Sequence, residues 1–139
     1  MGDDVIKREI QLKAQTEKLD ELLDILREDL TAMACPFDKL TTIEICAEEI
    51  FVNIASYAYG ENEGDAFISE EIREGNITLC FRDRGIHYNL LEKEDPDITL
   101  SAQERQIGGL GVYMVKRMMD SAEYEYKDGC NCLTVTMNW

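Results

Sequence analysis

A helical pattern over about 37–59 is the longest regular feature of the chain. Its apolar residues recur at steps of three and four, so they lie along one side of a helix. Gly60, Asn62 and Gly64 then end the element, because glycine and asparagine readily take the backbone conformations that close a helix. The pattern predicts an amphipathic helix whose buried side carries Leu40, Ile43, Ala47, Ile50, Ile54 and Ala58.

The rest of the chain divides into strand patterns, two further helices and one long loop at 86–107. Strands show apolar–polar alternation and join as hairpins around short turns at 74–76 and 128–129. Helices show apolar stripes, and Pro36 ends the first of them. Strands are expected at 4–13, 65–73, 77–83, 121–127 and 132–139, and the further helices run from about 16 to 35 and onward from the glycines at 108–111.

This order of elements predicts an α+β fold. Hairpin-joined strands with helices grouped between them indicate a two-layer α/β sandwich, in which a mixed, mostly antiparallel sheet is covered on one face by helices. With 139 residues the chain fits a single domain, 1–139.

Charge and hydropathy exclude some classes of partner. The net charge is −15, whereas nucleic-acid binding draws on basic patches, so direct nucleic-acid binding is not expected. There is no apolar run long enough to span a bilayer and no signal-peptide pattern, so no membrane contact and a cytoplasmic location are expected.

Five cysteines are present. Cys46 and Cys80 lie in apolar stretches and are interpreted as small core residues. Cys130 and Cys132 are close in sequence, but a C-x-C pair without nearby partner ligands is weak evidence for a metal.

The first candidate site is the pair Glu49 and Asn53 on the long helix. Residues four apart share a helix face, so both side chains project to one place at the edge of the apolar stripe. An amide oxygen suits Mg²⁺ and a carboxylate can accept a proton. The alternative is that Glu49 is simply solvated and Asn53 makes a local hydrogen bond.

The second candidate is Asp83-Arg84-Gly85, at the end of a predicted strand. The carboxylate can accept a hydrogen bond from an amino group, and the glycine lets the backbone approach a flat ring closely. The same three residues also suit a plain turn.

The third candidate is the run Gly108-Gly109-Leu110-Gly111, directly before a predicted helix. Free N–H groups and the helix dipole at such a place favour phosphate oxygens. The alternative is a flexible helix entry, and nearby Arg105 is either a phosphate contact or a solvated charge. Because the glycines follow a loop and no Lys-Ser/Thr pair follows them, this is neither a P-loop nor a Rossmann site.

In this order the three motifs resemble the Bergerat-fold (GHKL) ATP-binding superfamily, and within it the small bacterial anti-sigma factor serine/threonine kinases. The resemblance covers nearly the whole chain. The segments that carry it are AEEIFVN at 47–53, FRDRG at 81–85 and IGGLGV at 107–112.

The resemblance implies a role for each motif. Glu49 would be the general base and Asn53 the Mg²⁺ ligand, while Asp83, with Gly85 beside it, would bind the adenine amino group. The ATP lid would include Gly108, Gly109, Leu110 and Gly111, and Thr134 would lie beside the adenine. ATP and Mg²⁺ are the implied cofactors.

The resemblance also implies partners. Such a kinase phosphorylates a serine or threonine of an anti-sigma-factor antagonist (STAS) domain and holds a sigma factor on a second surface. A homodimer is expected, and an exposed edge strand at 4–13 would permit it. The chain departs from the family pattern at Tyr57 and His87, at Gly129-Cys130 and in the position of Arg105.

Other functions remain open from the sequence. A non-catalytic regulator would hold ATP as a conformational ligand and sequester a partner. A hydrolase would turn ATP over without a protein acceptor. A phosphodonor domain detached from a histidine kinase is disfavoured, because the chain has no dimerisation helix carrying a phosphoacceptor histidine.

Overall fold

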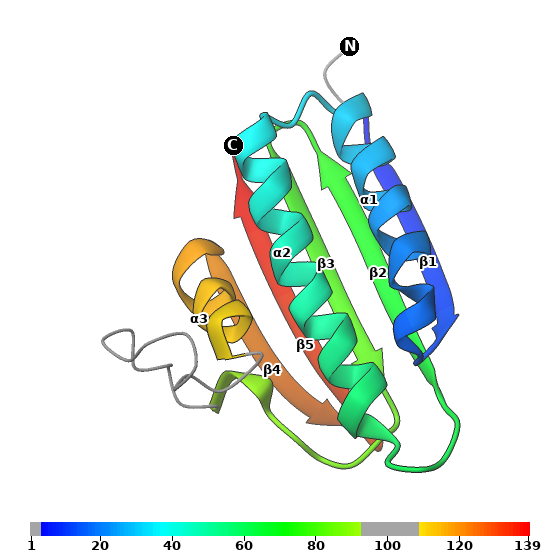
Figure 1. Cartoon of the computed structure of the whole chain (residues 1–139). Coiled ribbons are helices and arrows are strands. Elements are labelled where there is room, and N and C mark those ends of the chain that lie inside the picture. Colours follow the sequence, from blue (N-terminus) through cyan, green and yellow to red (C-terminus); the bar gives the residue numbers. More distant parts are fainter. Residues whose placement is uncertain (1–3, 93–108) are drawn as a thin grey trace.

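The computed structural model describes residues 4–92 and 109–139. Their strands form a five-stranded sheet in the order β1-β2-β3-β5-β4 (Figure 1), and every neighbouring pair is antiparallel. The α+β class is therefore confirmed, with an antiparallel sheet where a mixed one was still allowed. The strands are β1 (Ile6–Lys13), β2 (Asp65–Arg73), β3 (Asn76–Asp83), β4 (Ser121–Lys127) and β5 (Cys130–Asn138).

The helices cover one face of this sheet, as predicted (Figure 1). Here α2 lies between α1 and α3 and contacts both, while α3 also contacts β4. The long predicted helix is divided: its last turn is a π-helix, η2, which directly follows α2. The helices are η1 (Thr16–Lys18), α1 (Leu19–Ala32), α2 (Phe37–Asn53), η2 (Ile54–Ala58), η3 (Leu90–Glu92) and α3 (Gly109–Met118).

The core lies between the sheet and the helices. Side chains of a strand alternate between its two faces, so every second residue of β3 and β5 is buried under α2. The intervening residues face the opposite, helix-free side. The buried sheet residues are Ile77, Leu79, Phe81, Leu133, Val135 and Met137.

Two tight turns set the register of the hairpins. Asp128 and Gly129 have φ values of 55° and 77°, as a two-residue turn with a left-handed backbone requires. Because this turn occupies only two residues, β5 begins at Cys130, two residues before the predicted start. On its other side β5 pairs with β3, and the register of this pair places Asp83 directly opposite Asn131.

A cluster of charged side chains connects α1 to the edge of the sheet. Arg8 of β1 donates from both Nη2 and Nε to the carboxylate of Asp29 in α1, the first bond being 2.9 Å long. Glu70 of β2 lies beside them with its side chain fully buried, and within the described residues neither of its oxygens accepts a hydrogen bond. Burial and the neighbouring Asp29 raise the pKa of Glu70 to about 9.

Candidate functional site

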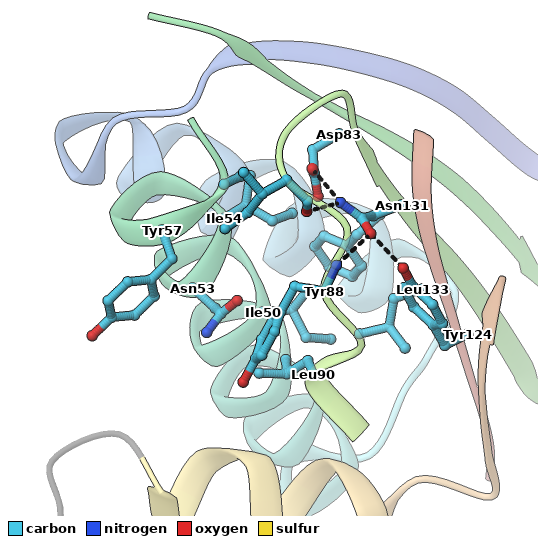
Figure 2. Close-up of a pocket in the computed structure, with 13 residues that line it drawn as sticks. Ile50, Asn53, Ile54, Tyr57, Asp83, Tyr88, Leu90, Tyr124, Asn131 and Leu133 are labelled. Atoms are coloured by element: carbon cyan, nitrogen blue, oxygen red, sulfur yellow. Dashed lines mark hydrogen bonds between the residues drawn. The ribbon is translucent and has the colours of Figure 1, made fainter. Parts of the chain in front are cut away.

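A cavity of about 330 Å³ opens beside the C-terminal end of α2 (Figure 2). One wall of the cavity is the last turn of α2 together with η2. Its floor is formed by the last residues of β3 and the first residues of β5. The segment 86–90 and β4 close the other side. The lining is mainly apolar with a few polar groups, which is the usual character of a small-molecule site. It consists of Ile50, Asn53, Ile54, Tyr57, Ala58, Phe81, Asp83, Ile86, Tyr88, Leu90, Tyr124, Asn131 and Leu133.

Asp83, the last residue of β3, is the buried acid of this cavity and is only 5% exposed. Its Oδ1 accepts two hydrogen bonds of 2.9 Å, from the backbone N–H of Gly85 and from Nδ2 of Asn131. No donor among the described residues is bonded to Oδ2. The carboxylate therefore keeps one acceptor for a ligand in the cavity.

Asn131 is the other buried polar residue of the cavity, and the sequence motifs did not single it out. Its Nδ2 donates to Asp83 and to the carbonyl oxygen of Ile86 at 2.8 Å. Its Oδ1 accepts from the backbone N–H of Tyr88 at 3.0 Å and from the hydroxyl of Tyr124 (Figure 2). The amide thus joins β3, β4, β5 and the 86–90 segment.

Thr134 does not reach the cavity, so its predicted place beside the adenine is wrong in the structure. It alternates with Leu133 and Val135, which are buried under the helices, and therefore faces the opposite side of the sheet, opposite Cys80. Asn131 occupies the cavity-facing position on the same strand. The signal was available in the sequence, because the apolar alternation of β5 assigns odd-numbered residues to the core.

Gly85 lets the chain leave β3 in close contact with the π-helix. A Cβ at this position would lie 2.1 Å from the carbonyl oxygen of Ala58. The next residue, Ile86, donates its N–H to the same oxygen at 2.8 Å. The missing side chain therefore serves a backbone contact, and close approach to a ligand ring stays a prediction.

Asn53 is the final residue of α2 and lines the cavity, with its amide directed into it (Figure 2). The π-helix begins immediately afterwards, and such single π-turns often occur at functional sites. The amide oxygen is a hard, neutral ligand of the kind Mg²⁺ takes together with phosphate oxygens and water. Asn53 therefore fits the predicted metal position.

Glu49 lies one helical turn before Asn53 but does not line the cavity. It packs instead against Gly111 in the first turns of α3, where a Cβ would be 2.6 Å from Glu49 Oε2. Gly111 thus permits the close contact of α2 and α3. Gly109 and Leu110 begin α3, whereas Gly108 and Arg105 lie outside the described residues.

Aromatic residues lie in and near the cavity. The ring of His87 stacks on Tyr126 at a centroid distance of 4.2 Å and lies parallel to Tyr124 at 6.1 Å. These contacts hold the segment after Asp83 against β4. Tyr57, one of the departures from the expected pattern, lines the cavity and is 64% exposed.

The cysteines do not add a metal site. Among the described residues no group of three or more His, Cys, Asp or Glu side chains is placed to hold a metal ion. Cys46 is a core residue, as expected, and burial followed by the charge of Glu49 raises its pKa to about 12. Cys80 is half-buried on the helix-free face of β3, so its assignment to the core was wrong. No helix in the described ranges has the length and apolar character needed to cross a membrane.

Comparison with known proteins identifies the family of the chain. A family model described as a histidine kinase-like ATPase domain matches residues 12–137. The serine/threonine-protein kinase BtrW of Bordetella bronchiseptica is 30% identical over 98 residues, 68% of this chain and 68% of the relative. The serine-protein kinase RsbW of Bacillus thuringiensis is 24% identical over 131 residues, 91% of this chain and 82% of the relative.

A solved structure shares the fold. The crystal structure of the RsbU and RsbW domains of Rv1364c from Mycobacterium tuberculosis has a TM-score of 0.68, with 17% identity over 96% of this chain. This chain spans only 32% of that longer one. At this identity the likeness supports the arrangement of sheet and helices.

Proposed function

Because the chain belongs to the histidine kinase-like ATPase domain family, we propose that it binds Mg-ATP in the cavity beside α2 and transfers the γ-phosphoryl group to a serine or threonine of a partner protein. The proposal is supported mainly by two polar groups that lie in one mainly apolar cavity. Asp83 offers an oxygen to which no donor in 4–92 or 109–139 is bonded, and Asn53 offers an amide on the α2 wall.

The adenine would enter the apolar part of the cavity. Its exocyclic amino group would donate to Oδ2 of Asp83, the oxygen that receives no donor from the described residues. Apolar side chains from α2, β3 and β5, such as Ile50 and Leu133, would cover the faces of the ring. Asn131, which lines the cavity, would lie on the adenine side in place of Thr134.

The phosphates would lie toward the start of α3. Asn53 would hold Mg²⁺, which when bound neutralises phosphate charge and orients the phosphoryl group. The run from Gly108 to Gly111 would contribute backbone N–H groups near the phosphates.

Glu49 would be the general base. Its carboxylate would accept the proton of the acceptor hydroxyl as the hydroxyl oxygen bonds to the γ-phosphorus. The bond between the γ-phosphorus and the bridging oxygen breaks at the same step, which releases ADP and leaves a phosphoserine or phosphothreonine.

The expected partners come from the resemblance of the sequence motifs to the anti-sigma factor kinases, and the relatives' names add only that those proteins are kinases. We expect the acceptor to be a STAS-domain anti-sigma-factor antagonist and the second partner to be a sigma factor. A cytoplasmic homodimer of single-domain chains, 1–139, is part of the proposal. β1 is an edge strand of the described sheet, which is compatible with pairing to a second copy.

The contact of Glu49 with Gly111 favours one alternative. Since α3 packs on Glu49, an acceptor hydroxyl would reach the carboxylate only if the contact with α3 leaves room for it. A non-catalytic regulator would need no such access, and would use ATP to hold a partner-binding conformation.

Phosphotransfer to the STAS protein encoded nearest this chain's gene tests the proposal. The wild-type protein should transfer labelled phosphate from ATP, and Glu49→Gln should retain ATP binding but lose transfer at least about 100-fold. Glu48→Gln is the matched control, because Glu48 is the adjacent, exposed carboxylate. A wild-type protein that forms an intact complex with ATP and the STAS protein but transfers nothing would exclude the kinase function.

A further inference from the structure

We propose that Asn131 is a positioning residue that, with Tyr124, fixes Asp83 so that the cavity selects a purine base bearing an exocyclic amino group. The inference rests on the proposed nucleotide site and assigns a basis for its selectivity. The Asn131 side chain makes four hydrogen bonds.

The orientation of the Asn131 amide is determined by its neighbours. Its two N–H bonds go to two acceptors, the Asp83 carboxylate and the Ile86 carbonyl, and its oxygen receives two donors. An amide has two donor hydrogens and two acceptor lone pairs, so its capacity is fully used. A flipped amide would set its NH₂ against the backbone N–H of Tyr88 and its oxygen against a carboxylate. The observed orientation is therefore strongly preferred, and Asn131, 6% exposed, has no hydrogen bond left to give to a ligand.

This arrangement fixes Asp83 as well. Two donors, Asn131 Nδ2 and the Gly85 N–H, both bind Oδ1 at 2.9 Å and so restrict the motion of the carboxylate. Since Asp83 lines the cavity, its second oxygen would serve a ligand there as an acceptor in a fixed place. Preorganised hydrogen-bonding groups recognise a ligand better than mobile ones, because less motion is lost on binding.

An acceptor in a fixed place discriminates between purines. Adenine carries an amino group at its 6-position and can donate to Asp83. Hypoxanthine, the base of inosine, carries a carbonyl oxygen there, and two acceptors facing each other in a buried site leave both unsatisfied. The cavity should therefore prefer ATP to ITP, and the strength of that preference should depend on how firmly Asp83 is held.

Tyr124 extends the network to β4. Its hydroxyl donates to Asn131 Oδ1 from the strand next to β5, and in the described residues it is the one side-chain donor on that oxygen. Tyr126 lies two residues further along the same strand and faces the same side, but it stacks on His87 and lies outside the cavity lining. The two tyrosines thus form a matched pair for a test.

The experiment compares ATP and ITP binding by calorimetry, with Mg²⁺ present, in the wild type, Asn131→Ala, Tyr124→Phe and Tyr126→Phe. The ratio of the two dissociation constants is the readout, since a general loss of structure weakens both nucleotides equally. Asn131→Ala should reduce the preference for ATP about 10-fold, as expected when a hydrogen bond to a charged group is lost. Tyr124→Phe should reduce it less, and Tyr126→Phe should leave it unchanged.

A double variant tests whether Asn131 acts through Asp83. In an Asp83→Ala background the preference should already be lost, and adding Asn131→Ala should not change the ratio further. Wild-type binding of ATP and ITP with equal affinity would overturn the inference and leave nucleotide binding standing. A preference that survives in both Asn131→Ala and Tyr124→Phe would also overturn it, whereas a wild type that binds neither nucleotide would overturn the proposed function itself.

Discussion

Gly111 of α3 lies directly against Glu49 of α2, so closely that a Cβ on the glycine would be 2.6 Å from Oε2 of the carboxylate. The sequence predicts a phosphate-binding role for the glycine run, and in the structure its last member, Gly111, is the contact point of two helices. The proposed catalytic carboxylate and the helix that follows the glycines are therefore mechanically linked. A shift of α3 would change the surroundings of Glu49.

Gly111→Ala tests this link. The added methyl group must displace either Glu49 or α3, so phosphotransfer should fall and the free energy of unfolding should decrease by about 1–3 kcal/mol. Gly60→Ala is the control: Gly60 has a φ of 60°, but a Cβ added there would meet no atom within 4 Å, so only backbone strain of about 1 kcal/mol is expected. Thermal unfolding and phosphotransfer rates measure both effects. Unchanged transfer in Gly111→Ala would show that the contact does not matter for Glu49.

Gly85→Ala should be more damaging. A Cβ would collide with the Ala58 carbonyl oxygen at 2.1 Å and break the hydrogen bond from Ile86. We expect a loss of about 2–4 kcal/mol in the free energy of unfolding together with weaker ATP binding, because the same contact shapes the cavity. Denaturant unfolding followed by circular dichroism gives the first quantity. A variant as stable as the wild type would contradict the close packing of η2 on the segment after β3.

Glu70 should make the stability of the protein depend on pH. Its pKa is raised to about 9 in the folded state from an ordinary value of 4.5, so the folded protein holds a proton that the unfolded chain releases. This contribution to the free energy of unfolding is fully present below about pH 4.5, decreases as the pH rises, and is lost as the pH passes about 9. Asp29 acts in the opposite sense at acid pH, because the hydrogen bond from Arg8 lowers its pKa.

Glu70→Gln should remove the alkaline part of this dependence. The amide keeps the shape of the side chain without its ionisation, so the variant should be more stable than the wild type at pH 8 by about 1–3 kcal/mol. Glu71→Gln is the control, since Glu71 is the next residue on β2 and pairs with Lys7 and Arg73 outside the core. Urea unfolding between pH 5 and pH 9 provides the measurement. An equal slope in the wild type and Glu70→Gln would refute the assignment.

Asn53→Ala should weaken nucleotide binding only when Mg²⁺ is present. The amide contacts the metal in the proposal and the base is held elsewhere, so ATP without Mg²⁺ should bind the variant and the wild type alike. With Mg²⁺, removal of one ligand should cost roughly 10-fold or more in affinity. The binding measurement without Mg²⁺ is the control for the measurement with Mg²⁺. A variant that loses ATP equally in both would place Asn53 in contact with the nucleotide rather than with the metal.

Periodicity predicted most of the fold. The apolar stripe of 37–59 identified α2 and the end of the helix near residue 59, and alternation with two turn signals identified both hairpins. The π-helix at Ile54–Ala58 was not predictable from such patterns. The π-helix occurs where Ala58 contacts Gly85 and Ile86, and these two residues are distant from it in sequence.

The site was predicted from motifs in part. The structure brings Asn53 and Asp83 to one cavity and places Glu49 beside it, while Thr134 faces the other side of the sheet. Strict alternation along β5 would have excluded Thr134 and pointed to Asn131. The same reasoning on β2 would have shown Glu70 among inward-facing residues, since it alternates with Ile68 and Ile72.

The most direct test of the account is a crystal structure with Mg²⁺ and a non-hydrolysable ATP analogue. We expect the adenine amino group to lie within hydrogen-bonding distance of Asp83 Oδ2 and Mg²⁺ to be coordinated by Asn53. A nucleotide bound outside this cavity, or an adenine whose amino group faces away from Asp83, would contradict it.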